Sequence, residues 1–310
     1  MAFEYNSDDG RTLTKSQEEL LETIENLPFP FGGISKLKDL RTRIKLDVHI
    51  TDREEMLDAW KHYIEHFYDP QNAFRKEEHF KACNDHQGEI GFRRDFAKDQ
   101  IRELTNPRDG YLPLLGLYSR TFNWWTKKQI PKVALIKDSI ADYASRSKAD
   151  EDNVFGFVFI QEMMHAYFDA FNSEGYPSME PLEEAFAEFA MLSFVSKSPS
   201  IRSKLFIDAK DYVISRIGKE PRGYGFGFEL FERAGVDTEW MIQRYREISN
   251  WTVPLDIKYK YGNKYLDSQR NYCLDYSEEN ADNYFEYVMG VLKIDWKRPI
   301  DPIQPAIGEP

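Results

Sequence analysis

The sequence predicts a mostly helical α+β domain, and three observations support this fold class. Apolar residues recur at helical spacing over most of the chain. Two short runs before its middle, RTRIKLDVHIT and KVALI, have the composition of strands and predict a small sheet. Of the 310 residues, 41% are hydrophobic and 15% are aromatic, which is enough for an extensive packed core.

The chain shows no internal repeat, low-complexity block or linker, so we expect a single domain over residues 14–297. Before it, residues 1–13 are acidic and polar and are expected to be disordered. After it, residues 298–310 form a Pro-rich tail that is expected to run extended over the surface.

Helices are expected around both strands of the first half. Residues 16–26 predict a helix that ends at the PFPFGG stretch. Apolar residues alternate over 44–50, as in a half-buried strand, and Thr51 with Glu54 has the spacing of a capping box for the next helix. This helix is expected to continue to residue 67. A short buried strand is expected at 132–136, and a polar helix follows it at 138–148.

The second half predicts a helix that is apolar on nearly every side, residues 154–171, and acidic residues 150–152 precede it. A turn at Gly262 and Asn263 predicts a hairpin near the end of the domain. Four further helices are expected between them. Two cover residues 182–195 and 198–217, one is entered through the Gly-rich start of 222–235, and the last is capped by Asp237 or Thr238.

The composition argues against several classes of function. A net charge of −12 disfavours binding to nucleic acid or to an anionic membrane, because either needs a basic patch. The chain has no apolar run long enough to cross a membrane and no secretory signal at its acidic N-terminus, which favours a cytoplasmic protein. Cys83 and Cys273 lack metal-binding spacing and are expected to be buried thiols.

Three polar residues interrupt the apolar helix: Gln161, Glu162 and His165. Gln161 and His165 lie one turn apart on one face, and Glu162 lies beside them. Burying an unpaired carboxylate is costly, so solvent, hydrogen-bond partners or a metal must face this group.

The order of these residues, QEMMH, differs at one position from HExxH, the helical motif that supplies two zinc ligands and a general-base Glu. Eighteen residues separate His165 from Glu184, which lies in PLEEAFAEF. This spacing and local pattern resemble the gluzincin zinc metallopeptidases, including their aminopeptidase branch. The resemblance covers about residues 130–235 and implies a zincin-like domain with a small sheet preceding the active-site helix.

The resemblance also implies roles for individual residues. The metal ligands would be His165, Glu184 and, in place of the first motif His, Gln161. Glu162 would be the general base. Glu188, one turn after Glu184, would orient the first ligand.

Two further features fit the same family. Tyr224, in GYGFGFELF, falls where these enzymes often place a Tyr that stabilises the oxyanion. A structural role in the core or in a turn is the simpler explanation for this residue. The strand at 132–136 would be the edge strand that lines the substrate cleft.

The Gln at the first motif position is a departure from the family. An amide oxygen binds zinc more weakly than an imidazole, so we expect zinc to be bound weakly or not at all. The sequence therefore predicts a pseudo-peptidase that binds a peptide or protein in its cleft. The alternative is an active zinc hydrolase in which Gln161, or a distant histidine, completes the site. The candidate histidines are His49, His62, His66, His79 and His86.

Simpler explanations are also open for these residues. The polar positions within 161–172 would be the solvated stripe of an amphipathic helix, and the glutamates within 180–188 a solvated acidic face. His62 and His66, one turn apart, are expected to face solvent rather than to bind a metal. A Gln161 introduced into an active enzyme is a further alternative.

Overall fold

The structure is a computed structural model, and it describes residues 13–58, 61, 114–123, 128–170, 180–215, 226–234 and 283. The chain forms two compact units, one of Met1–Tyr167 with Ile207–Ala209 and one of Phe168–Phe206 with Lys210–Pro310. In the described ranges helices predominate beside one three-stranded sheet, which confirms the α+β class. Residues 1–12, the Pro-rich tail and the predicted hairpin lie outside those ranges.

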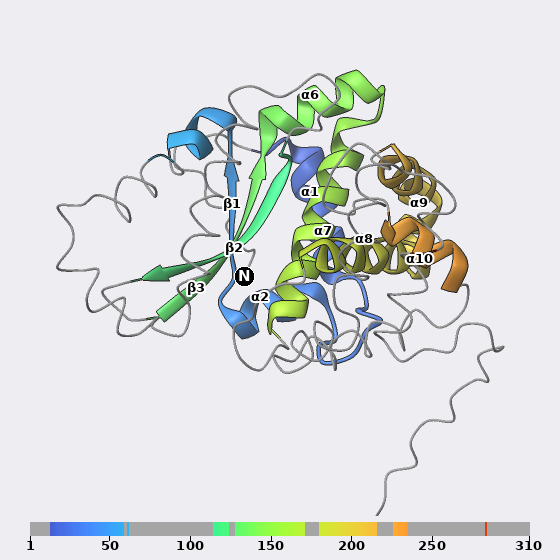
Figure 1. Ribbon diagram of the computed structural model, residues 1–310, viewed down its shortest axis with the longest axis horizontal. Coiled ribbons are helices and arrows are strands. Elements are labelled where there is room, and N and C mark those ends of the chain that lie inside the picture. The colour runs from blue at the N-terminus through green and yellow to red at the C-terminus, as the bar shows by residue number, and fades with distance from the viewer. Residues whose placement is uncertain are drawn as a thin grey trace, which may run out of the picture. The chain divides into compact units, whose positions relative to one another are not determined.

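The sheet of the first unit has the strand order β1-β3-β2 (Figure 1). Its strands are β1 (Asp47–Thr51), β2 (Gly116–Asn123) and β3 (Lys128–Ile136). β3 lies in the middle, parallel to β1 and antiparallel to β2. The buried strand predicted at 132–136 is confirmed as the end of β3. It is the central strand, so the expectation that it forms an edge is wrong; among the described residues the two outer strands are β1 and β2.

The two faces of the sheet pack against different helices. Residues directly opposite each other share a face, so Ile50, Leu135 and Gly116 form one row. A Cβ placed on Gly116 would meet Val158 at 2.6 Å, so α7 (Glu151–Ala170) covers this face. The opposite face carries a small apolar cluster of Met56, Ala134 and Ile136.

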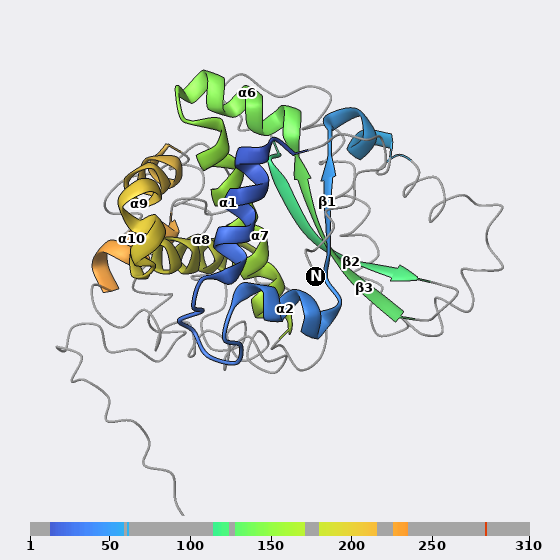
Figure 2. The ribbon, with the colours of Figure 1, turned by 180° about the vertical axis from the view of Figure 1, so that it is seen from behind.

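α7 is the helix that the sequence predicts to be buried, and it is buried from its third residue to its eighteenth. Oδ1 of Asp150 accepts a backbone hydrogen bond from the first turn at 3.0 Å, as expected for an acidic residue that caps a helix. α1 (Lys15–Asn26) packs beside α7, because a Cβ on Gly156 would meet Leu20 at 3.1 Å (Figure 2).

Only part of the strand predicted over residues 44–50 is correct. α2 (Leu37–Ile44) includes the first of these residues, and the chain then turns at Lys45, whose φ is 55°. β1 begins at Asp47. The apolar alternation continues across the helix end, because Leu46 is buried in the turn between the two elements.

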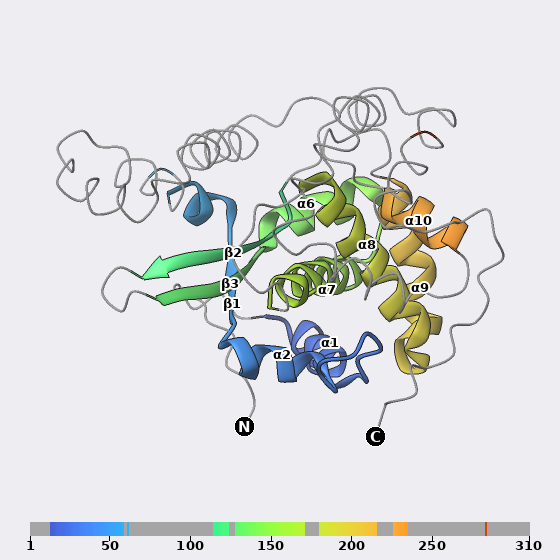
Figure 3. The same ribbon diagram turned by 60° about the horizontal axis from the view of Figure 1, so that its bottom comes forward.

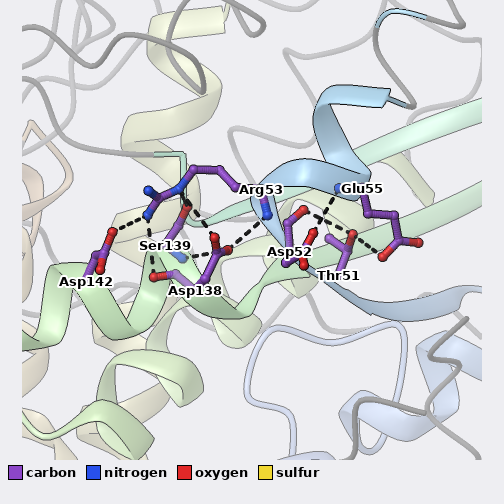
Figure 4. Close-up of polar contacts among 7 residues, drawn as sticks. All are labelled: Thr51, Asp52, Arg53, Glu55, Asp138, Ser139 and Asp142. Atoms are coloured by element: carbon purple, nitrogen blue, oxygen red, sulfur yellow. Dashed lines mark hydrogen bonds and ion pairs between the residues drawn. The ribbon is translucent and has the colours of Figure 1, made fainter. Parts of the chain in front are cut away.

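The helix after β1 begins one residue later than the sequence predicts (Figure 4). Asp52, not Thr51, caps it: the backbone N–H of Glu55 donates to Oδ1 of Asp52 at 2.9 Å. The hydroxyl of Thr51 donates instead to Oε2 of Glu55 at 2.8 Å. Asp52 and Glu55 have the same three-residue spacing as Thr51 and Glu54, so the spacing alone did not distinguish the two pairs.

Arg53 joins that helix to α6 (Lys137–Ser147), which follows β3 directly (Figure 4). Its backbone N–H donates to Oδ1 of Asp138 at 3.0 Å, and its Nε donates to Oγ of Ser139 at 3.0 Å. Its Nη2 pairs with Asp142. Because β1 and β3 are parallel, their carboxyl ends lie side by side. Arg53 therefore joins the two helices that follow these strand ends.

The second unit contains three further helices (Figure 3). They are α8 (Glu180–Lys197), most of α9 (Pro199–Ile214) and α10 (Phe226–Ala234). The described ranges confirm the first three helices predicted here, and the helix predicted after Asp237 lies outside them. α10 crosses α8 closely, because a Cβ on Gly227 would lie 2.5 Å from the carbonyl oxygen of Ala185.

Candidate functional site

The three polar residues of the QEMMH motif on α7 are all buried. Gln161 is 3% exposed, Glu162 is 8% exposed and His165 is 6% exposed. Each of them interacts with other groups of the chain, as the cost of burying polar groups requires. The interpretation as a solvated stripe is therefore wrong for these three residues, because solvent barely reaches them.

Glu162 lies against the first residue of β2. A Cβ placed on Gly116 would lie 2.9 Å from Cγ and 2.9 Å from Oε1 of Glu162. Such a separation is shorter than real Cβ contacts, so the carboxylate occupies space that a side chain at position 116 would need. The structure thus brings a buried carboxylate of α7 to the edge strand of the sheet.

α8 carries the two downstream glutamates of the predicted site. Glu188 is fully buried and Glu184 is partly buried, and both interact with other groups. Gly227 of α10 lies over Glu188, because its Cβ would be 2.5 Å from the Cβ of Glu188. The interpretation of this face as solvated is wrong for Glu188.

The predicted ligand set draws on both units. Gln161, Glu162 and His165 belong to the first unit, and Glu184 and Glu188 belong to the second. Tyr224 lies outside the described residues, so its role as an oxyanion-stabilising residue stays a prediction.

Of the distant histidines, His49 is the one in the described ranges. It is buried in β1, and its Nε2 lies 3.0 Å from Oε1 of Glu55. Its register partner is Ala134, which places it on the face opposite the α7 face that holds Glu162. His49 therefore does not complete a site around Glu162. The other candidates, at positions 62, 66, 79 and 86, lie outside the described residues.

The donor set does not fit a catalytic zinc ion. Such an ion generally has three protein ligands, and imidazole is a better ligand than a neutral amide oxygen. The predicted set offers one imidazole, from His165, one carboxylate, from Glu184, and the buried amide of Gln161. Among the described residues, His, Cys, Asp and Glu side chains form no group of three that could hold a metal ion.

Neither β2 nor the role of Gly116 was predicted from the sequence. The run GLYSRTFN contains two aromatic residues and one β-branched residue, which favour a strand. A glycine opposite a buried helix is the signal that would have indicated a close approach.

Comparison with protein-family models, with curated proteins and with solved structures finds no significant match to this chain. Within the described residues, no helix combines the length and the apolar character that crossing a bilayer requires.

Proposed function

We propose that this chain is a zincin-like pseudo-peptidase, which binds a peptide or protein segment without cleaving it. The proposal rests on the buried polar residues of α7. Gln161 stands at the first position of the motif, and Glu162 lies against the outer strand β2. The order of the elements supports the proposal. A small sheet with an antiparallel outer strand precedes the motif helix, as the resemblance to zincins implies.

The edge strand suggests how a peptide would bind. β2 pairs with β3 on one side, and no other described strand pairs with its second side. Extended peptides add to such edges through main-chain hydrogen bonds. We propose that the ligand lies along β2, beside the carboxylate of Glu162.

Peptide hydrolysis is disfavoured by the ligand set. A zincin uses zinc to activate the water that its Glu deprotonates. With an amide at position 161, zinc affinity should fall by more than the 10–100-fold, ~1.4–2.8 kcal/mol, that is typical of losing a residue that merely supports a ligand. A cytoplasmic location, with no nucleic-acid or membrane partner, completes the proposal.

Restoring the motif tests the scaffold. We expect Gln161→His to gain zinc affinity by a factor of about 100 or more, because it adds an imidazole to the proposed ligand set of His165 and Glu184. Isothermal titration of metal-free protein with zinc measures this change. His165→Ala and Glu184→Gln, each added to Gln161→His, should abolish the gain.

Two other outcomes decide against the proposal. An unchanged zinc affinity in Gln161→His would show that the scaffold is not zincin-like. Stoichiometric zinc in the natural chain, lost in His165→Ala, together with peptidase activity lost in Glu162→Gln, would establish the active hydrolase instead. The matched control is Glu25→Gln, which removes a buried carboxylate far from the motif in the sequence.

A displayed peptide library tests the ligand class. Selected peptides should protect from hydrogen exchange those backbone amides of residues 116–118 that point away from β3, because the peptides would cover the open side of β2. Binding that leaves these amides unprotected would place the ligand elsewhere.

A further inference from the structure

Gly116 occupies a position that no larger residue could take without moving α7 side chains. Its Cβ would lie 2.6 Å from Cγ1 of Val158 and 2.9 Å from Cγ and Oε1 of Glu162. Val158 and Glu162 are one helical turn apart, so they present the same face of α7 to the start of β2. Two side chains of one helix therefore fill the space above this single glycine.

The neighbouring residues of the sheet leave no room for a side chain at position 116. Gly116 pairs with Leu135, and Leu135 pairs with Ile50, and both of these side chains are buried. On the other side of α7, Gly156 is already in close contact with α1. The helix is thus enclosed on two sides, and a side chain at position 116 would have to be accommodated by local side-chain movement.

The two neighbours of Gly116 differ in how easily they can move. Val158 is branched at Cβ and has one strongly preferred rotamer in a helix. Glu162 has three rotatable side-chain bonds, and its contact with position 116 is made by Cγ and Oε1, which rotation about these bonds can move. A side chain at position 116 would therefore displace the carboxylate of Glu162 before it displaced Val158.

We propose that Gly116 is a positioning residue, whose lack of a side chain keeps the carboxylate of Glu162 against the first residue of the edge strand. The functional meaning of this position rests on the proposed function, in which Glu162 lies beside the bound peptide. The contact itself depends only on the geometry of the first unit.

Carboxylate labelling tests the proposal on the full chain without any ligand or metal. Carbodiimide with glycine ethyl ester modifies accessible carboxylates, and peptide mass spectrometry reads each site. In the natural chain Glu162 should label slowly, because it is 8% exposed. In Gly116→Ala its labelling should rise severalfold. Glu25, which is buried and bonded to Arg41, should stay unlabelled in both.

Two variants separate this role from general loosening. Gly156→Ala adds a methyl to the same helix against α1, where Leu20 lies at 3.1 Å, and should leave the labelling of Glu162 unchanged. Gly116→Ala should lower the melting temperature, because its methyl group meets Val158. Adding Val158→Ala removes this tightest contact and should recover part of that loss. In that folded double variant Glu162 should still label faster than in Val158→Ala alone.

The proposal is overturned by unchanged labelling of Glu162 in either Gly116 variant, or by labelling that rises equally at Glu25. Failure of this experiment leaves the zinc test of Gln161→His unaffected, since Gly116 contacts no predicted ligand in the described contacts. Failure of the zinc test, in turn, removes the functional meaning of Glu162 but not its contact with Gly116.

Discussion

Tyr167 shows how a single polar group can fix a long-range contact. It lies on α7, two residues after His165, and is fully buried. Its hydroxyl donates to the carbonyl oxygen of Phe31 at 2.9 Å and lies 3.3 Å from that of Gly32. Its ring also packs edge-on against Phe29, with centroids 4.7 Å apart. The motif helix is thereby held to the loop after α1.

Removing this hydroxyl should destabilise the protein measurably. Tyr167→Phe keeps the ring packing but leaves a buried carbonyl without its donor, which costs about 1–3 kcal/mol. Urea unfolding followed by circular dichroism measures the loss. Ser193→Ala is the matched control, since its hydroxyl donates to Phe189, a carbonyl within the same helix, at 2.7 Å. That carbonyl keeps its helical bond, so the control should lose less, and equal losses would contradict the argument.

At the scale of elements, glycines set how closely two pieces of backbone approach. Gly227 allows α10 to cross α8, and Gly156 allows α1 to pack on α7. The atoms that face the two positions differ. A Cβ on Gly227 would meet backbone atoms, 2.5 Å from the oxygen of Ala185, whereas one on Gly156 would meet the end of the Leu20 side chain.

Alanine should therefore change the free energy of unfolding differently at the two positions. Ala is favoured over Gly within a helix by about 1 kcal/mol. In Gly227→Ala the backbone clash should outweigh this gain and cost about 1–3 kcal/mol net. In Gly156→Ala the flexible tip of Leu20 can move, so the variant should be neutral or slightly more stable. Thermal unfolding of both variants measures the difference, and a stabilised Gly227→Ala would contradict the close crossing.

At the scale of the whole molecule, charge is the property that the composition already determines. The chain carries a net charge of −12, from 53 acidic and 41 basic residues. Binding to nucleic acid draws most of its affinity from basic side chains that displace counterions from phosphates. A long-range repulsion of polyanions is expected unless the fold gathers the basic residues on one face.

We accordingly expect no retention on a heparin column and no shift of double-stranded DNA, even at ~50 mM salt, where such binding is strongest. The same protein should bind an anion exchanger and elute with salt. A basic protein in the same buffer serves as the positive control. Retention on heparin that weakens as salt rises would indicate a basic surface that the composition does not reveal.

Much of the helical framework was predictable because its signals are local. α1, α6 and α7, together with the helices of the second unit, follow from periodicity that neighbouring residues create among themselves. Errors arose where one local pattern fits two structures. The alternation over 44–50 spans both the end of α2 and β1, and the capping spacing fits both Thr51 and Asp52.

The sequence by itself determined the α+β class, the buried helix and the set of polar residues that α7 carries. Those properties depend on residue order and on hydrophobic spacing within one segment. Only the tertiary structure decided that β2 is an outer strand of the described sheet, that Gly116 lies against Glu162, and that His49 lies on the opposite face. Each of these depends on strand pairing between segments far apart in the chain, which no local pattern encodes.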